Sequence, residues 1–153
     1  MSDAILRYPT PLSREESWAR EFSEAIEVPA GAKTITLSGV GALPSNRDAG
    51  SRTVEYFGDM QTQTRSVLDQ IQQILEARGY ALGDVVAVQA LFVADQANDG
   101  MPDFDGFSTV YRNYFGSKAQ PNLPARTRAQ VVRLVEPGWL VEVTVTAAKV
   151  VNT

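Results

Sequence analysis

The 153-residue sequence contains no cysteine and no histidine. The absence of cysteine excludes disulfides, thiolate nucleophiles and cysteine-based metal sites. The absence of histidine removes the commonest general base and the commonest metal ligand. The carboxylates are scattered without the spacing of a metal site, so no metal is expected. Any chemistry must therefore use carboxylates, arginine, lysine, tyrosine, hydroxyls, backbone amides and water.

The sequence also lacks an excess of positive charge and a long apolar run. The net charge is −4 and the pI is about 4.8, which argues against a nucleic-acid partner because phosphate binding needs clustered Lys and Arg. The longest apolar run, residues 85–94, is interrupted by Gln89 and is too short to cross a bilayer. The first residues do not resemble a signal peptide. We therefore expect a cytoplasmic protein with no membrane partner.

The length and composition fit one globular domain. The apolar fraction is 44% and the charged fraction 21%, and a chain of this size hides roughly 70% of its unfolded surface. Residues 1–20 carry Pro9, Pro11 and mixed charge, which predicts an irregular lead-in to a single domain spanning residues 1–153.

Two short strands are expected at residues 24–28 and 34–38, paired as a hairpin through the Pro-Ala-Gly turn between them. A loop rich in Gly, Ser, Asn and Asp follows at 41–58. A helix then begins after Asp59 as N-cap and ends near Gly79. Its apolar stripe consists of Val67, Leu68, Ile71, Ile74 and Leu75.

The rest of the chain predicts a buried strand from residue 85, a helix over 104–115 and two final strands. The aromatic residues of the helix, spaced three and four apart, are interpreted as core. The strands at 126–135 and 139–150 are expected to pair through a Pro137-Gly138 type II turn. The order β-β-α-β-α-β-β predicts an α+β fold with two helices on one face of a mixed sheet. The other face, with Leu140, Val132 and Leu134 beside Glu142, is expected to form a subunit interface.

Arg126 and Glu142 are candidates for chemistry. Arg126 begins a strand just after Pro124, and a guanidinium whose plane is fixed can bind a carboxylate in a bidentate manner. Glu142 lies in a Val-rich strand, where burial of a carboxylate is costly unless it is paired. A structural ion pair for Arg126, and a solvated face or a partner such as Arg128 or Arg133 for Glu142, are the alternatives.

The stretch PARTRAQVVRLVEPGWLVEVTVTA resembles the carboxy-terminal motif of the Rid family, the YjgF-like reactive-intermediate deaminases. Leu37-Ser38-Gly39, the segment GDMQTQTRSVLDQIQQILEARGY and DVVAVQALFVAD extend the resemblance from about residue 22 to residue 150.

The resemblance implies a chorismate-mutase-like fold and a homotrimer with clefts between subunits. It also implies cofactor-free hydrolysis of 2-imino or enamino acids to 2-keto acids and ammonia. The carboxylate-binding arginine of the family falls on Arg126, and the acidic residue that positions water falls on Glu142. A backbone amide of the site falls at Arg128, and the loop after the second strand contributes Ser38 and Gly39.

The chain departs from the family at several positions. Phe22 replaces a commoner tyrosine, Val40 follows Ser38-Gly39 where glutamine is usual, Ser108 replaces an asparagine, and Arg128 stands where cysteine is frequent. The second cation at Arg128 suggests a larger or more acidic substrate. The alternatives are a non-catalytic metabolite-binding trimer, a deaminase of a ring-cleavage product such as 2-aminomuconate, and a ribonuclease, which the charge disfavours.

The expected hairpin sets a distance between the two candidate groups. It places Glu142 opposite about Arg133. Arg133 is seven residues from Arg126, and seven residues of a strand span over roughly 20 Å. We therefore expect Arg126 and Glu142 to meet only across a subunit boundary.

Overall fold

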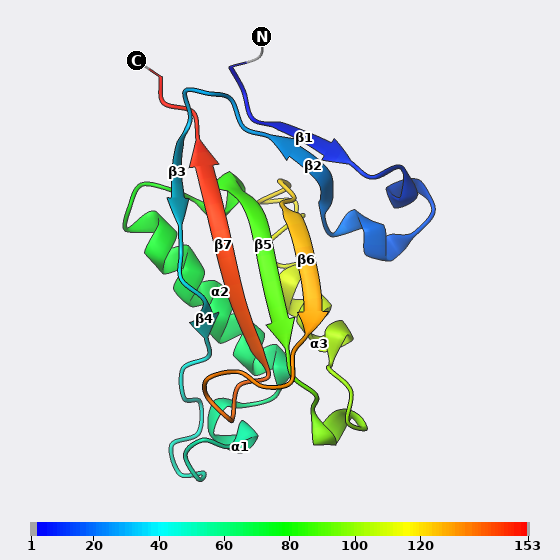
Figure 1. Ribbon diagram of the computed structural model, residues 1–153, viewed down its shortest axis with the longest axis vertical. Coiled ribbons are helices and arrows are strands. Elements are labelled where there is room, and N and C mark those ends of the chain that lie inside the picture. The colour runs from blue at the N-terminus through cyan, green and yellow to red at the C-terminus, as the bar shows by residue number, and fades with distance from the viewer. Residues whose placement is uncertain (1–2, 153) are drawn as a thin grey trace.

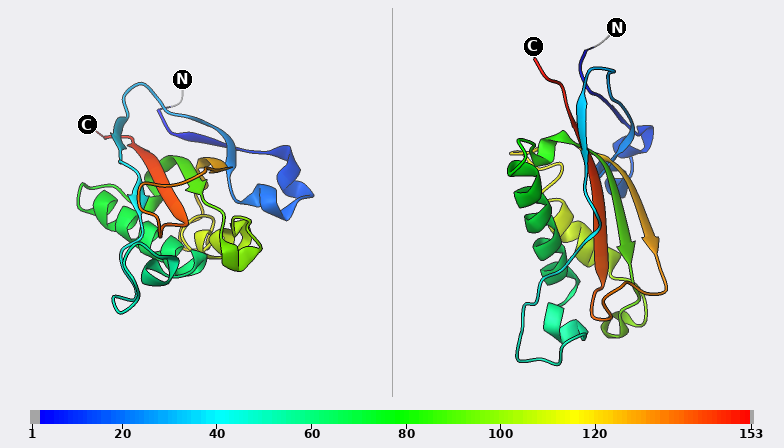
Figure 2. Two further views of the ribbon diagram at one scale, coloured as in Figure 1. Left: turned by 60° about the horizontal axis from the view of Figure 1, so that its bottom comes forward. Right: turned by 60° about the vertical axis from the view of Figure 1, so that its left-hand side comes forward.

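The computed structural model describes residues 3–152, and its core is a sheet with helices on one face (Figures 1 and 2). The strands of this sheet lie in the order β3 (Lys33–Thr36), β7 (Val141–Lys149), β5 (Val85–Phe92) and β6 (Ala125–Gln130). β4 (Val40–Gly41) also pairs with β7. Among the strands of residues 3–152 only β5 and β6 run parallel, and the intervening helix α3 (Phe104–Tyr111) supplies the crossover that a parallel pair needs. The predicted α+β fold with a mixed sheet is confirmed.

The long helix α2 (Met60–Glu76) follows the predicted pattern. Asp59 caps it by accepting a hydrogen bond from the Thr62 N–H at 2.9 Å, which holds the pKa of Asp59 below its usual value. Gly79, with φ of +79°, lies in the turn after the helix. The stripe is the face that packs on the sheet, and its members Val67, Leu68, Ile71 and Leu75 are fully buried. α3 is shorter than predicted; its rings Phe107 and Tyr111 are fully buried.

The remaining elements are short. They are β1 (Leu6–Pro9), β2 (Ser23–Glu27), the helix α1 (Val54–Phe57) and the 3-10 segments η1 (Pro11–Arg14), η2 (Ser17–Arg20), η3 (Leu82–Asp84) and η4 (Gln96–Asn98). None of the helices among residues 3–152 is both long and apolar enough to pass through a membrane.

The first predicted hairpin is wrong. β2 pairs with β1, a strand inside the supposed irregular lead-in, and β3 pairs with β7. The turn at 29–32 does form, since the Ala32 N–H donates to the Pro29 carbonyl. The chain nevertheless crosses the end of the sheet here, from beside β6 to the opposite edge (Figure 1). A local turn sequence does not determine which strand becomes the neighbour.

The second predicted hairpin is also wrong, because β5 inserts between β6 and β7. The turn is present, with the Trp139 N–H bonded to the Glu136 carbonyl at 3.0 Å, but it lies in a loop rather than between paired strands. Glu142 therefore pairs in register with Leu91 and Gly41 and not with Arg133. β5 takes an interior position beside β7, where an apolar strand such as β5 buries both of its faces best.

The open face of the sheet differs from the prediction. Leu140 and Leu134, expected on that face, are 2% and 9% exposed, whereas Val132, also expected there, is 92% exposed. The side chains that alternate with the buried ones along β7 are Glu142, Thr144 and Thr146. This face is more polar than predicted, so it does not by itself argue for a subunit interface.

Arg7 holds the β1–β2 ribbon on the main sheet. Its guanidinium donates to the carbonyls of Val85 at 3.0 Å, Leu123 at 2.8 Å and Gly83 at 2.9 Å, and burial lowers the pKa of Arg7.

We expect Arg7→Ala to reduce the free energy of unfolding by about 1.5–3 kcal/mol, since hydrogen bonds from a charged donor are lost. Urea denaturation measures this, with the exposed Arg14→Ala as control. Equal effects of both substitutions would contradict it.

Candidate functional site

Arg126 lies on the edge strand β6, and its side chain is buried against α3. It pairs in register with Val88 of β5, and its side chain is only 2% exposed. The guanidinium lies over the ring of Tyr111 at 4.7 Å and over the ring of Phe22 at 5.6 Å. Contacts with two aromatic faces thus restrict the orientation of this cation.

Glu21, immediately before β2, is the carboxylate partner of Arg126. Its Oε2 accepts hydrogen bonds from Arg126 Nη1 and from Ser108 Oγ, both at 3.0 Å. Its Oε1 accepts from Arg112 Nη1 at 3.1 Å, and its side chain is 6% exposed. The Tyr111 hydroxyl donates to the Glu21 backbone carbonyl at 3.0 Å. A buried carboxylate is tolerated here because each of its oxygens is hydrogen-bonded to a cation.

Arg128 extends the cluster along β6. Its Nη1 donates to Ser108 Oγ at 3.0 Å, and its guanidinium lies over the ring of Phe104 at 5.5 Å. Burial, and next the charge of Arg126, lower the pKa of Arg128, while the charges of Glu21 and Asp105 oppose that shift. With Arg112 there are three arginines around the Glu21 carboxylate. The cluster therefore retains positive charge that a further anion would offset.

A cavity of about 460 Å³ opens beside Arg126, between the amino-terminal segments and the β5–β6 edge of the sheet. Arg126 and Thr127 of β6, Ala87 and Val88 of β5 and Ser23 of β2 border it. Glu24 of β2 and Ala125 of β6 also border it. Its remaining walls come from η1, η2 and the residues beside them: Thr10, Leu12, Trp18 and Phe22. The segment predicted to be an irregular lead-in thus contributes three of the lining residues, Thr10, Leu12 and Trp18.

The remaining predicted site residues lie at the other edge of the sheet. Ser38 and Gly39, between β3 and β4, border a separate hollow of about 380 Å³. The Glu142 carboxylate lies directly against Gly39, where an added Cβ would come within 2.8 Å of Glu142 Cδ and Oε2. Glycine at this position makes room for the carboxylate.

One chain keeps Arg126 and Glu142 apart. β6 and β7 are separated by β5, and Arg126 is in register through Val88 with Val145, three residues from Glu142. The two Cα atoms are therefore roughly 14 Å apart. The side chains also leave opposite faces, since Arg126 contacts α3 while Glu142 alternates with the buried valines of β7. The predicted residues thus form two groups: Arg126, Arg128, Ser108 and Phe22 in one, Ser38, Gly39 and Glu142 in the other.

Sequence reasoning did not identify Glu21 or Trp18, and it assigned Tyr111 to the core alone. Glu21 lies among several acidic residues of the first 27 positions, and nothing in its spacing distinguishes it from them. The spacing of the aromatic residues correctly placed Tyr111 on the inner face of α3. It gave no indication that the Arg126 guanidinium would lie against that ring. Within residues 3–152 no three potential ligand side chains come together as a metal site would require.

Comparison with known proteins gives matches over most of the chain. The family model for endoribonuclease L-PSP matches residues 15–149. A RutC family protein of Sulfurisphaera tokodaii is 39% identical over 129 residues, which cover 84% of this chain and 87% of that protein. A 3-aminoacrylate deaminase, RutC, of Acinetobacter baylyi is 35% identical over 109 residues, covering 71% of this chain and 74% of that protein.

Solved structures share the fold. A protein of the conserved Rid protein family from Yersinia pestis superposes with a TM-score of 0.64 at 23% identity, covering 94% of this chain and 98% of the other. A member of the YjgF protein family from Neisseria meningitidis gives a TM-score of 0.54 at 25% identity, covering 97% and 98%. The sheet with helices on one face is thus the architecture of this group.

Proposed function

We propose that this chain, which belongs to the endoribonuclease L-PSP family and has relatives named RutC, hydrolyses reactive 2-imino or enamino acids to 2-keto acids and ammonia. The observation that carries the proposal is Arg126, a buried cation that contacts the faces of two rings and borders a cavity of about 460 Å³. A guanidinium in such a position suits the carboxylate that these substrates share.

The similarity to the Acinetobacter baylyi protein supports the wider class of enamino acids, since the amino group of its named substrate is on C3 and hydrolysis there gives a 3-oxo acid. Its name, 3-aminoacrylate deaminase, describes a substrate that carries a carboxylate and an amino group on a carbon–carbon double bond. The tautomer of such an enamine is an imine, and both give a carbonyl compound and ammonia on hydrolysis. The chemistry requires an anion anchor and an oriented water molecule, and needs no cofactor.

The proposed reaction begins with the substrate carboxylate on Arg126. Arg126 has five N–H donors, so it can share them between Glu21 and a substrate. Phe22 borders the cavity and lies against the guanidinium, so its half-buried ring controls access. Water adds to the carbon of the C=N bond while the nitrogen takes up a proton. The C–N bond of the resulting carbinolamine then breaks, which leaves the keto acid and ammonia.

Glu142 is the proposed group that orients the water, and a second copy of the chain would supply it. In one protomer Glu142 lies beside Gly39 at the edge opposite β6. A homotrimer in which the β6 edge of one copy meets the Ser38–Gly39 edge of the next would unite the two groups of residues in each cleft. Positioning of the water relative to the fixed imine lowers the barrier mainly through orientation.

Release of keto acid from an imine that an amino acid oxidase generates in situ tests the proposal. We expect the protein to accelerate conversion above the rate without protein, and the Arg65→Ala variant, altered on the exposed face of α2, to behave like the wild type. No acceleration with small, bulky or acidic imino acids would contradict the proposal.

Non-catalytic binding of a keto acid is the second candidate function. The observation that favours it is the Glu21 carboxylate already bonded to Arg126, since a substrate must share this cation with a permanent partner. Saturable binding of a keto acid without turnover of any imine would select this candidate. Cleavage of RNA is not proposed, because the chain has a net charge of −4 and no histidine.

A further inference from the structure

Trp18 is an exposed aromatic residue that the core does not require. It lies on η2, where only Ala19 is buried, and its side chain remains 49% exposed. The indole Nε1 donates to Glu16 Oε2 at 3.2 Å, so the polar group of the ring already has a partner. What Trp18 presents to the cavity is therefore the apolar part of its ring.

The ring of Trp18 continues the wall that begins at Arg126. It stacks on Phe22 with a centroid distance of 6.2 Å and an interplanar angle of 28°, and Phe22 in turn lies against the Arg126 guanidinium. One wall of the cavity thus passes from a fixed cation, across one aromatic ring, to a second and more exposed ring. A ligand anchored by its carboxylate at Arg126 would extend its other end along this wall.

The rest of the lining is mixed and leaves space: Thr10, Ser23, Glu24 and Thr127 are polar, while the residues nearest the proposed side-chain pocket are apolar or small. Leu12, 49% exposed, borders the same cavity from η1, and the strand side presents the small residues Ala87 and Ala125. A volume of about 460 Å³ falls within the range of roughly 300–1,000 Å³ usual for ligand pockets. A three-carbon imino acid on Arg126 would leave most of this space to water, whereas a branched or aromatic side chain would displace it.

We propose that Leu12 and Trp18 form a side-chain pocket, and that the protein prefers imines derived from amino acids with bulky apolar side chains. The inference rests on the proposed function for its chemistry. The fit of a bulky apolar carboxylic acid beside Arg126 can be tested without turnover. Trp18 is then a specificity-determining residue, and its contribution comes from apolar contact with the substrate side chain.

Substrate selectivity gives the first test. The quantity measured is kcat/KM for the imine of leucine divided by kcat/KM for the imine of alanine. A substitution that lowers activity toward both imines equally leaves this ratio unchanged. The wild type is expected to favour the leucine imine, and Trp18→Ala to lower the ratio about tenfold. Trp18→Phe should retain most of it. Leu43→Ala removes a comparably exposed apolar side chain that does not border the cavity, and should keep the wild-type ratio.

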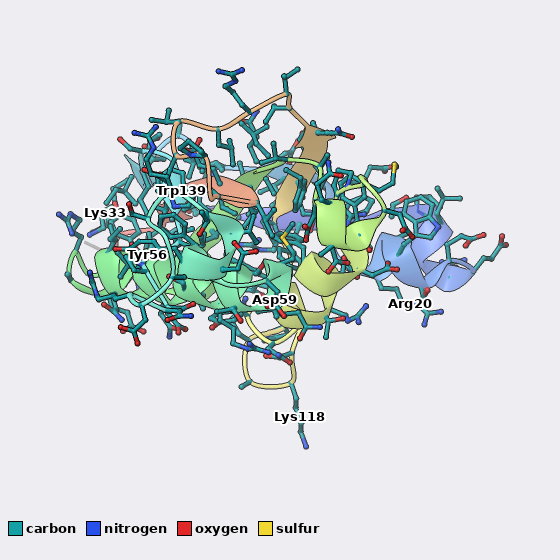
Figure 3. The ribbon with its side chains drawn as sticks, turned by 90° about the horizontal axis from the view of Figure 1, so that it is seen from below. Arg20, Lys33, Tyr56, Asp59, Lys118 and Trp139 are labelled. Atoms are coloured by element: carbon teal, nitrogen blue, oxygen red, sulfur yellow. The ribbon has the colours of Figure 1, made fainter. Side chains whose placement is uncertain are left out.

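Tryptophan fluorescence gives a second test, independent of catalysis. The chain has two tryptophans, and Trp139 lies on the opposite side of the molecule from η2, which Arg20 marks in Figure 3. In a Trp139→Phe background the signal comes from Trp18 alone. We expect 4-methyl-2-oxopentanoate to change this signal in a saturable way at concentrations where pyruvate does not.

The two tests separate the failure of this inference from failure of the proposed function. Turnover with a ratio that Trp18→Ala leaves unchanged would overturn the pocket and leave the deaminase intact. A saturable signal without turnover of any imine would support the pocket and overturn the deaminase. If Trp18→Ala instead changes the oligomeric state and no ligand alters the fluorescence, a second copy of the chain occupies the cavity and the inference is wrong.

Discussion

Arg126→Ala is expected to lower kcat/KM at least about a hundredfold, because the substrate loses the group that fixes its carboxylate and hence its reacting carbon. Arg126→Lys should recover only a small part of the loss. A lysine keeps the charge, but it lacks the planar fork that Tyr111 and Phe22 hold in place. The measurement is keto acid release at several imine concentrations, so that kcat and KM are obtained separately.

Two controls make this result interpretable. Circular dichroism and denaturation must show that the variants fold, since Arg126→Ala leaves the Glu21 carboxylate without one of its partners. Arg112→Ala removes another arginine from Glu21, but one that is 59% exposed and does not border the cavity. It should retain most of the activity. If Arg126→Ala were as active as Arg112→Ala, Arg126 would not be the anchor.

Glu21→Gln is expected to reduce the free energy of unfolding by about 3–5 kcal/mol, because it leaves the buried Arg126 without a compensating charge. In a chain of this length such a loss lowers the Tm on the order of 10 °C. Thermal and urea denaturation measure the effect. Glu24→Gln is the matched control, since it changes a carboxylate of the same strand region that is exposed, and should stay within about 0.5 kcal/mol of the wild type.

A double-mutant cycle isolates the Glu21–Arg126 pair. Glu21→Gln combined with Arg126→Gln should be less destabilised than the sum of the single variants, because both charges leave the interior together. If Glu21→Gln were no more destabilising than Glu24→Gln, the ion pair would make no net contribution. Glu21 would then act only as a hydrogen-bond acceptor for Ser108 and Arg112.

The elements that could be predicted from the sequence are those whose hydrophobic periodicity lies within a single helix or strand. α2 and β5 carry their own periodicity, and Asp59 caps α2 as expected. Both hairpins failed because a turn such as Pro137-Gly138 reports only its own geometry, whereas the neighbour of a strand is chosen by burial over the whole sheet. β5, rather than β7, is the neighbour of β6 because burial over the whole sheet favours that order.

The candidate site divides in the same way. Arg126, Arg128, Ser108 and Phe22 do come together, although only the resemblance to a family linked them beforehand. Glu21 was not predictable, since its contacts join it to residues 87 to 105 positions away and no local pattern marks it. The contribution of η1 and η2 to the cavity was missed because short 3-10 segments have no periodicity to detect.

The proposed mechanism requires a site divided between copies of the chain, with Arg126 from one copy and Glu142 from another. Subunit mixing tests this directly with Arg126→Ala and Glu142→Gln, each expected to be nearly inactive alone. When the two variants are unfolded, mixed in equal amounts and refolded, a shared cleft in a trimer predicts wild-type residues in about a quarter of the sites, and activity in that proportion. Mixed oligomers that form but remain as inactive as the separate variants would contradict it.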